Sequence, residues 1–332
     1  MKLAGRVVIE EFDCEALKGN PLGDPARRPI PVYLPEGYDR SGRRYPVIYW
    51  LHGFTGTGLG AANYNPWVPS LPELIDRVIQ EGAPPAILVM ADGYTTYGGS
   101  QYLNSTANGR YEDSIKELVA YVDTYYRTMP SRNHRGLNGK SSGGYGALVL
   151  AMRNPQLFGA VASHSGDLYF ESCYKVDFWK AADTIRKHGG LDGYLKAFRE
   201  APKKTEELVR TMVTVVAMAM AYSPNPDRPH GFDMPFDLET GEVDEAVWAR
   251  WLEWDPVYMV ERHADNLRAM RLIYVECGSK DQYNLHHGAR ILHRRMERLG
   301  IRHEYQEFDD DHTAVNYRYV ESLRRLCTAL RA

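Results

Sequence analysis

The stretch LNGKSSGGYGA, residues 137–147, is compatible with two different kinds of site. The letters GKS can end a phosphate-binding P-loop, G-x-x-x-x-G-K-S/T, whereas GKSSG matches G-x-S-x-G, a turn that presents a nucleophilic serine. The P-loop needs a glycine five positions before Gly139 to start the turn around the phosphates, and His134 occupies that place. The preceding segment contains Pro130 and lacks the apolar run of a strand. The sequence therefore favours the nucleophile turn.

Small residues surround Ser141, as a tight strand-to-helix turn requires. Gly139 and Gly143 flank the serine, and glycine lets one backbone approach another where a Cβ atom would clash. Gly144 and Gly146 continue this surface into a predicted helix, YGALVLAMRN. A glycine-rich turn with an incidental serine fits the same letters, so the rest of the chain has to distinguish the two interpretations.

Apolar runs typical of strands alternate with amphipathic helices, the pattern of a mainly parallel α/β sheet flanked by helices. An antiparallel pair is predicted first, followed by continuous β-branched and apolar runs typical of strands buried on both faces. Helices with one apolar face are predicted over residues 111–126 and 284–300. The predicted strands are residues 6–14, 28–35, 45–53, 85–93, 134–139, 159–166, 272–281 and 303–312.

One region interrupts this alternation. Residues 167–265 contain no convincing strand and are far longer than a normal crossover between parallel strands. Within it, residues 205–222 are apolar around most of a helix circumference, and residues 244–259 bring several tryptophans together. We interpret 167–265 as a helical cap inserted between late strands, after a first core part, 1–166, and before a second, 266–332.

Candidate catalytic residues follow the predicted strands. Ligands of parallel sheets collect at the carboxyl ends of the strands, and in a serine hydrolase of this kind the order is Ser, then acid, then His. Ser141 is the candidate nucleophile, His312 the general base, and Asp281 the acid that orients the imidazole. Asp281 could instead cap the helix that follows it, and Asp167 is then the substitute acid.

Other acids and histidines are weaker candidates. Asp309, Asp310 and Asp311 directly precede His312 and are expected to form a solvated turn. The remaining histidines close to these segments are expected on a surface helix or in strands, with structural roles: His164, His286, His287 and His303.

The negative charge that develops on an attacked carbonyl oxygen requires two preorganised donors. The residue after the nucleophile supplies one, here the backbone N–H of Ser142, and the loop LHGFTGTG supplies the other, assigned to the backbone N–H of Phe54. The same loop formally matches a dinucleotide fingerprint at Gly56, Gly58 and Ala61. That fingerprint needs a helix, which the proline-broken segment AANYNPWVP does not predict.

Three tyrosines in the loop after residues 85–93 are candidates to line an acyl or aryl pocket, or are ordinary loop residues: Tyr94, Tyr97 and Tyr102. No metal site is predicted, because FDDDH lacks the spacing and the glycine of an EF-hand and the histidines do not form HExxH. No cofactor is expected either.

The composition of the 332-residue chain is that of a soluble globular protein, with 44% hydrophobic and 25% charged residues. A formal net charge of −3, with both signs mixed along the chain, argues against nucleic acid or an anionic membrane as the main partner. Neither a signal peptide nor an apolar span of about 18 residues is visible. Free thiols in a reducing cytoplasm are expected, because the four cysteines form no CxxC pair: Cys14, Cys173, Cys277 and Cys327.

Four stretches, YPVIYWLHGFTG, GKSSGGYGAL, CGSKD and DDDHTAVNYRY, together resemble the putative-esterase family of α/β-hydrolases. That family includes esterase D, feruloyl esterases, enterochelin esterases and mycolyltransferases. The resemblance covers roughly residues 28–166 and 270–325 and implies an α/β-hydrolase fold. It also implies that the family's nucleophile, acid, base and two oxyanion donors fall on Ser141, Asp281, His312, Phe54 and Ser142.

These observations predict a cytoplasmic serine carboxylesterase that hydrolyses short-chain or aryl esters through an acyl-enzyme. Acyl transfer to an alcohol is the enzymatic alternative, which a water-excluding cap would favour. A catalytically inactive module that binds small molecules is the alternative from another class. The expected partner is a small-molecule ester, and the apolar segment 205–222 could line its pocket or pack against a second subunit of a homo-oligomer.

Overall fold

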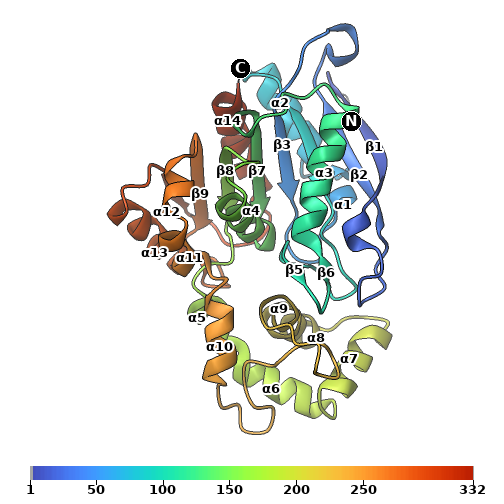
Figure 1. The fold of residues 1–332 in the computed structure, drawn as a ribbon, viewed down its shortest axis with the longest axis vertical. Helices are drawn as coiled ribbons and strands as arrows, with labels where there is room; N and C mark the ends of the chain where they lie inside the picture. Colours follow the sequence, from blue (N-terminus) through green and yellow to red (C-terminus); the bar gives the residue numbers. More distant parts are fainter. Residues whose placement is uncertain (1–2, 332) are drawn as a thin grey trace.

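The computed structural model describes residues 3–331 and contains a central eight-stranded sheet (Figure 1). Its strands form at the predicted segments, and the continuous apolar, β-branched runs among them suit the buried centre of the sheet. These strands are β1 (Arg6–Asp13), β2 (Arg27–Leu34), β3 (Val47–Leu51), β4 (Ile87–Ala91), β7 (Arg135–Lys140), β8 (Ala160–His164), β9 (Leu272–Gly278) and β10 (Glu304–Phe308). A separate hairpin, β5 (Asn104–Ser105) and β6 (Gly109–Arg110), is too short for a sequence pattern to predict.

The strand order is β1-β2-β4-β3-β7-β8-β9-β10. β1 pairs antiparallel with β2, as predicted, β2 pairs antiparallel with β4, and every neighbouring pair from β4 to β10 is parallel. In this register Leu51 of β3 lies beside Gly139 of β7, which lies beside Ser163 of β8. The carboxyl ends of the three central strands therefore meet at one edge of the sheet, where such folds place their ligands.

Helices cover both faces of the sheet and form two cores. Successive residues of a strand point to opposite faces, so Tyr49 and Leu51 of β3 enter one core while Ile48 and Trp50 enter the other. The first core contains the predicted helices α3 (Tyr111–Tyr125), α4 (Ser142–Arg153) and α13 (Leu285–Arg298). The second contains α2 (Leu71–Gln80) and α14 (Tyr319–Leu330), and α1 (Gly58–Ala62) contacts β2 and β4.

Between β8 and β9 the described chain forms helices and no strand. We call α5 to α12 the inserted helices; in Figure 1, α6 to α10 lie at the end of the molecule opposite the chain termini. The division of the chain at 167–265 into core and cap stays a prediction. The inserted helices are α5 (Phe170–Cys173), α6 (Phe178–Lys187), α7 (Leu191–Glu200), α8 (Glu206–Thr211), α9 (Ala217–Tyr222), α10 (Glu245–Leu252), α11 (Pro256–Arg262) and α12 (Ala264–Arg268).

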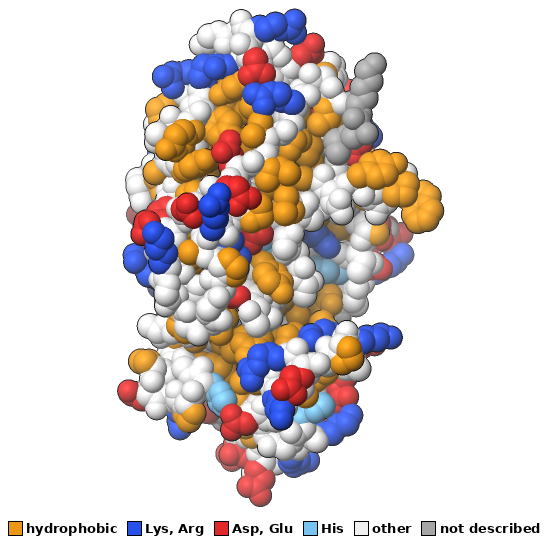
Figure 2. Space-filling model, turned by 90° about the vertical axis from the view of Figure 1, so that its right-hand side faces the viewer, with side chains coloured by type: hydrophobic (Ala, Val, Ile, Leu, Met, Phe, Trp, Pro, Cys, Tyr) orange, Lys and Arg blue, Asp and Glu red, His pale blue; other side chains and the backbone are white. Residues whose placement is uncertain are grey.

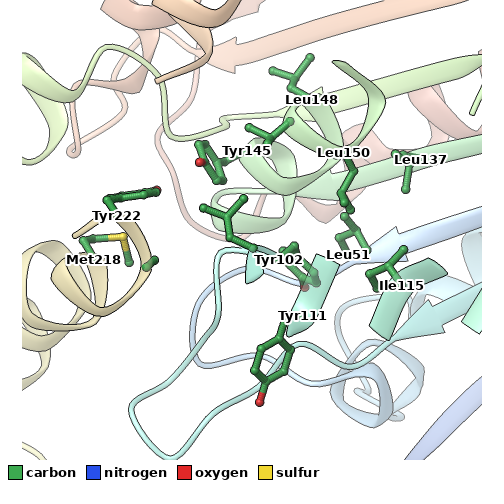
Figure 3. Close-up of a cluster of buried hydrophobic side chains, with 14 of the residues drawn as sticks. Leu51, Tyr102, Tyr111, Ile115, Leu137, Tyr145, Leu148, Leu150, Met218 and Tyr222 are labelled. Atoms are coloured by element: carbon green, nitrogen blue, oxygen red, sulfur yellow. The ribbon is translucent and has the colours of Figure 1, made fainter. Parts of the chain in front are cut away.

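The apolar segment 205–222 packs the inserted helices against α4 and the β5 hairpin. In it, α8 and α9 flank a π-helical turn, Met212–Val216, and every residue of α9 is buried. Figure 3 shows Tyr222 of α9 and Tyr145 of α4 in one hydrophobic cluster, and their rings lie 5.8 Å apart. The inserted helices therefore share a core with α4 rather than folding around a core of their own.

The surface carries charges of both signs. Figure 2 shows acidic and basic side chains interspersed over one face of the molecule, as the mixed charge along the chain predicts. Among residues 3–331, no helix combines the length and the apolar character needed to cross a bilayer.

Candidate active site

Ser141 lies between β7 and α4, where the chain changes from strand to helix. Its φ of 57° and ψ of −126° are costly for any residue that carries a side chain. Two backbone hydrogen bonds hold it there, because the Ser141 N–H donates to His164 O at 2.9 Å and the Tyr145 N–H donates to Ser141 O at 2.9 Å. The turn keeps the serine at the carboxyl edge of the sheet, as the G-x-S-x-G pattern predicts.

Gly139 and Gly143 permit this turn because backbone atoms crowd both positions. A Cβ atom on Gly143 would lie 2.0 Å from Leu51 O, and one on Gly139 would lie 2.3 Å from Gly143 O. Any side chain would force the backbones apart, so β3, β7 and α4 can pack this closely only with glycine here. The glycines of the motif therefore have a steric cause in this chain.

The structure brings the three candidate catalytic side chains together. Ser141 Oγ lies 3.1 Å from His312 Nε2, and His312 Nδ1 lies 2.7 Å from Asp281 Oδ2. Asp281 follows β9 and His312 follows β10, so the parallel sheet delivers both to the edge that holds Ser141. Asp281 and His312 are buried.

Asp281 pairs with His312 and does not cap α13, whose N-cap residue is Asn284. Its Oδ2 pairs with the imidazole, while its Oδ1 accepts the Tyr283 N–H at 2.9 Å and so orders the turn before α13. The Tyr283 ring packs edge-on against His312, with 4.9 Å between ring centroids. The side chain of Gln282 accepts the His312 N–H at 2.9 Å. Asp281 and Tyr283 therefore hold the imidazole ring, and Gln282 holds the backbone of His312.

Within residues 3–331, none of the other candidate acids is hydrogen-bonded to the His312 side chain. Asp309 pairs with Lys280, Asp310 accepts the Tyr317 hydroxyl, and Asp311 accepts the Thr313 N–H, which makes this run a surface turn as expected. Asp167 lies close to Ser141 but is not bonded to His312. Among residues 3–331, no group of three or more His, Cys, Asp or Glu side chains is placed to hold a metal ion.

The two predicted oxyanion donors flank the serine. Ser142 is the first residue of α4, where backbone N–H groups have no partner inside the helix. Phe54 follows Gly53, and a Cβ atom on Gly53 would lie only 3.3 Å from Ser141 Cβ. Within residues 3–331, neither backbone N–H donates a hydrogen bond. Their role as oxyanion donors stays a prediction.

Two residues hold the Phe54 loop: His52, which the sequence analysis did not assign to the site, and Tyr102, which it named as a candidate for the pocket. His52 Nε2 accepts the Gly93 N–H at 2.8 Å, so the ring proton lies on Nδ1, which donates to Gly53 O at 2.8 Å. Burial lowers the pKa of His52, which keeps this ring neutral and the tautomer constant. The Tyr102 hydroxyl donates to His52 O at 2.8 Å. No local pattern predicts these contacts, because they join segments about forty residues or more apart in the chain.

A cavity of about 230 Å³ opens beside the serine. The sheet edge and its loops form one side, and the inserted helices form the other through the π-helical turn and its neighbours. π-helical turns occur preferentially at functional sites, and here the turn supplies Val213 and Thr214 to the cavity. The lining comprises Gly53, Phe54, Thr55, Lys140, Ser141, Asp167, Cys173, Tyr174, Val209, Val213, Thr214, Met218, Tyr283, Leu285 and His312.

None of the three tyrosines proposed from the sequence lines this cavity. Tyr102 is buried beneath the Phe54 loop, with its hydroxyl on His52 O. Tyr97 is buried, and its hydroxyl accepts a hydrogen bond from Arg199 of α7. Tyr94 is partly exposed at the surface. The structure instead places tyrosines from other segments, Tyr174 and Tyr283, on the cavity wall.

A second Ser–His–carboxylate chain lies inside the protein. His164 Nε2 lies 2.7 Å from Ser322 Oγ, and His164 Nδ1 lies 2.6 Å from Glu276 Oε1. All three residues are fully buried, and none lines the cavity at Ser141. A substrate cannot reach the buried Ser322. These hydrogen bonds instead connect α14 to β8 and β9 and stabilise their packing. The structural role expected for His164 fits these contacts.

Comparison with known proteins agrees with this fold. The chain is 32% identical over 139 residues to an esterase of Mycobacterium tuberculosis, covering 41% of this chain and 28% of that protein. It is 32% identical over 192 residues to an endo-1,4-beta-xylanase/feruloyl esterase of Xylanibacter ruminicola, covering 54% of this chain and 26% of that protein. The chain thus spans about a quarter of the length of these curated relatives.

Solved structures resemble the whole chain at low sequence identity. A ferulic acid esterase superposes with a TM-score of 0.65 at 18% identity, covering 99% of this chain and 100% of that one. An S-formylglutathione hydrolase from Agrobacterium tumefaciens superposes with a TM-score of 0.61 at 16% identity, covering 100% and 98%. The family model described as Putative esterase matches residues 25–324, which is most of the chain. The chain therefore belongs to this esterase family, and its fold is the α/β-hydrolase fold that the sequence predicted.

Proposed function

We propose that the chain is a serine carboxylesterase that works through an acyl-enzyme intermediate. The observation that carries this proposal is the unbroken series of contacts from Asp281 through His312 to Ser141, ending on a cavity that a small molecule can enter. Membership of an esterase family supports the same reaction.

In the proposed mechanism, Ser141 Oγ attacks the carbonyl carbon of the ester while His312 Nε2 takes its proton. Asp281 keeps the Nδ1–H tautomer and stabilises the imidazolium that forms. The backbone N–H groups of Phe54 and Ser142 would stabilise the negative charge on the carbonyl oxygen. His312 then gives the proton to the departing alcohol, and a water molecule repeats the sequence to release the acid.

The cavity supports short-chain or aryl acyl groups as substrates. Its volume of about 230 Å³ suits a small acyl group, and Val209, Val213 and Met218 give it an apolar wall. Those three side chains come from the inserted helices, so we propose that residues 167–265 act as a cap that selects the acyl group. The names of related proteins are compatible with both kinds of acyl group, because feruloyl is an aryl acyl group and formyl, in the S-formylglutathione hydrolase, is a short one.

Hydrolysis of p-nitrophenyl esters from acetate to decanoate tests the proposal directly. We expect turnover of the short esters, a loss of roughly 10³- to 10⁶-fold in kcat for Ser141→Ala, and roughly 10⁴-fold for Asp281→Asn, which disturbs the His312 tautomer. The matched control is Ser322→Ala, which removes the serine of the buried second chain and should leave kcat unchanged.

A fluorophosphonate probe provides a readout that does not depend on the choice of ester. Labelling at Ser141 alone is expected, because only an activated and accessible serine reacts. If the native protein hydrolyses none of the esters and the probe fails to label Ser141, the esterase proposal is wrong, and a binding module without catalysis is the remaining interpretation.

Acyl transfer is the second candidate, and one observation favours it. A second cavity, of about 470 Å³, shares Gly53, Phe54, Thr55 and Lys140 with the first and could hold an acceptor alcohol. Adding methanol or glycerol during hydrolysis distinguishes the two reactions. A transferase forms more of the new ester than the ratio of alcohol to water predicts, whereas a hydrolase does not.

A further inference from the structure

Asp167 is an acidic side chain of the cavity at Ser141 that has no part in the proposed mechanism. It follows β8, it is 8% exposed, and it lines the same cavity as Ser141. No lysine, arginine or histidine within residues 3–331 forms an ion pair with it. Burying a carboxylate without a cation is costly, and proteins keep such a group mainly where it has a function.

The neighbours of Asp167 hold only one of its two oxygens. Oδ2 accepts the Tyr174 hydroxyl at 2.7 Å and Gln101 Nε2 at 3.0 Å. Oδ1 accepts no hydrogen bond from residues 3–331, yet protein atoms do not enclose it. Because Asp167 lines the cavity, this second oxygen is an acceptor that a bound molecule can reach.

The residue that orients Asp167 is itself held in an unfavourable conformation. Gln101 is buried, has a φ of 55°, and leaves its own Oε1 without a partner among the described residues. Its Nε2 lies 2.8 Å from the Tyr222 hydroxyl as well as within reach of Asp167. Positive φ at a non-glycine residue persists where the surrounding structure demands it, and such strain concentrates at functional sites.

The electrostatics of the site agree with a carboxylate that needs a donor. Burial raises the pKa of Asp167, and the hydrogen bonds from Gln101 and Tyr174 counteract that rise only in part. A hydroxyl or an ammonium group delivered by a ligand would satisfy the open oxygen and lower the cost of burial.

We propose that Asp167 is a specificity-determining residue that accepts a hydrogen bond from a hydroxyl or ammonium group on the acyl part of the substrate. The inference rests on the proposed esterase function. The required group is an O–H or N–H donor on a short acyl chain, because Asp167 lines the same cavity as Ser141, which attacks the acyl carbonyl. An acyl chain that ends in a methyl group leaves Asp167 unpaired and is the poorer substrate.

Methyl esters that differ only at the end of the acyl chain test this proposal. For each chain length from propanoate to octanoate, three nearly isosteric esters end in a methyl, a hydroxyl or an ammonium group, and kcat/KM is measured by pH-stat. At one chain length we expect a donor-ended ester to exceed its methyl-ended counterpart by about 10-fold or more. The hydroxyl and ammonium esters show which donor the site prefers.

Two variants of Asp167 then test whether this residue causes the preference for donor-ended esters. Asp167→Leu should remove it by lowering kcat/KM for the donor-ended ester about 10- to 100-fold while sparing the methyl-ended one. Asp167→Asn keeps the size and one acceptor, so it should retain a preference for hydroxyl and lose one for ammonium. Asp183→Asn is the matched control, because Asp183 lies on the inserted helices with its side chain 75% exposed.

The outcomes separate the inference from the esterase proposal. A native protein that hydrolyses methyl-ended esters and shows no donor preference at any length overturns the role of Asp167 and leaves the esterase function intact. A uniform loss on all esters in both Asp167 variants, with a lower melting temperature, shows that Asp167 only supports the fold. A native protein that hydrolyses no ester and is not labelled at Ser141 overturns both.

Discussion

Ser141 and two residues near it adopt backbone conformations that their side chains disfavour. The φ angles are 57° at Ser141, 55° at Gln101 and 43° at Ser165. Each such residue costs on the order of 1–3 kcal/mol, which the surrounding packing has to offset. Two of the three lie in the elbow or just after the neighbouring strand β8, and the third orients Asp167. At the scale of single residues, the strain therefore coincides with the proposed chemistry.

The elbow conformation predicts a stability difference between two inactive variants. Ser141→Gly should be about 1 kcal/mol more stable than Ser141→Ala, because both lose the hydroxyl and only glycine adopts a φ of 57° without strain. Urea denaturation, followed by circular dichroism, measures the two free energies of unfolding. Equal stability of the two variants would show that the elbow is not strained.

At the scale of elements, one buried polar network ties β8, β9 and α14 together. Glu276 of β9 bonds His164 of β8, which bonds Ser322 of α14, and Arg318 donates to Glu276 at 2.7 Å. Burial disfavours the charged form of Glu276, but the attraction of His164 and the hydrogen bonds outweigh it and lower its pKa to about 2. The network is therefore built around a carboxylate that must stay ionised.

This depressed pKa predicts how stability depends on pH. The contribution of Glu276 is fully present above about pH 4.5, its unfolded pKa, and is lost as the pH falls towards 2. Glu276→Gln removes this stabilising contribution at every pH and leaves Arg318 without its buried carboxylate partner. We therefore expect the free energy of unfolding at pH 7 to fall by about 3 kcal/mol. Thermal melts of the native protein and of Glu276→Gln between pH 7 and pH 3 measure this pH dependence. As the pH falls, the melting temperature of the variant should decrease less steeply than that of the native protein.

At the scale of the whole molecule, two cores and the inserted helices enclose every cysteine. Cys14, Cys173, Cys277 and Cys327 are free and buried, and none forms a disulfide. Burial raises the pKa of Cys14 and of Cys327 to about 12, so little of either thiol is ionised at neutral pH. The fold therefore depends on packing and not on covalent cross-links.

Thiol labelling tests this enclosure. Because the thiolate is the reactive form, native protein should react with a disulfide reagent such as dithionitrobenzoate far more slowly than protein unfolded in guanidinium chloride, which exposes all four thiols. Cys173 lines the cavity, so it is expected to react first, and Cys173→Ala should remove the earliest phase. Rapid labelling of several cysteines in the native protein would contradict the two-core packing.

The sequence by itself determined the features that depend on local chemistry. Short apolar runs that alternate with amphipathic helices are typical of a parallel α/β sheet, and each of the eight strands of the main sheet overlaps a predicted segment. The crowding around Gly139 and Gly143 leaves few conformations for G-x-S-x-G, so the elbow could be predicted as well. Because parallel strands place their carboxyl ends at one edge, the meeting of Asp281 and His312 with Ser141 followed from chain order.

The tertiary structure alone decided which side chains surround that edge. Tyr94, Tyr97 and Tyr102 were candidates for the pocket because of their position in a loop, but the loop folds Tyr102 beneath His52 and away from the cavity. The hydrogen bonds that join His52 to Gly93 and Gln101 to Asp167 connect segments far apart in the chain, which no local pattern encodes. The sequence pattern predicts that the inserted segment is helical but not where its helices pack. Their contacts with α4, α13 and β5 determine which side chains they contribute to the cavity.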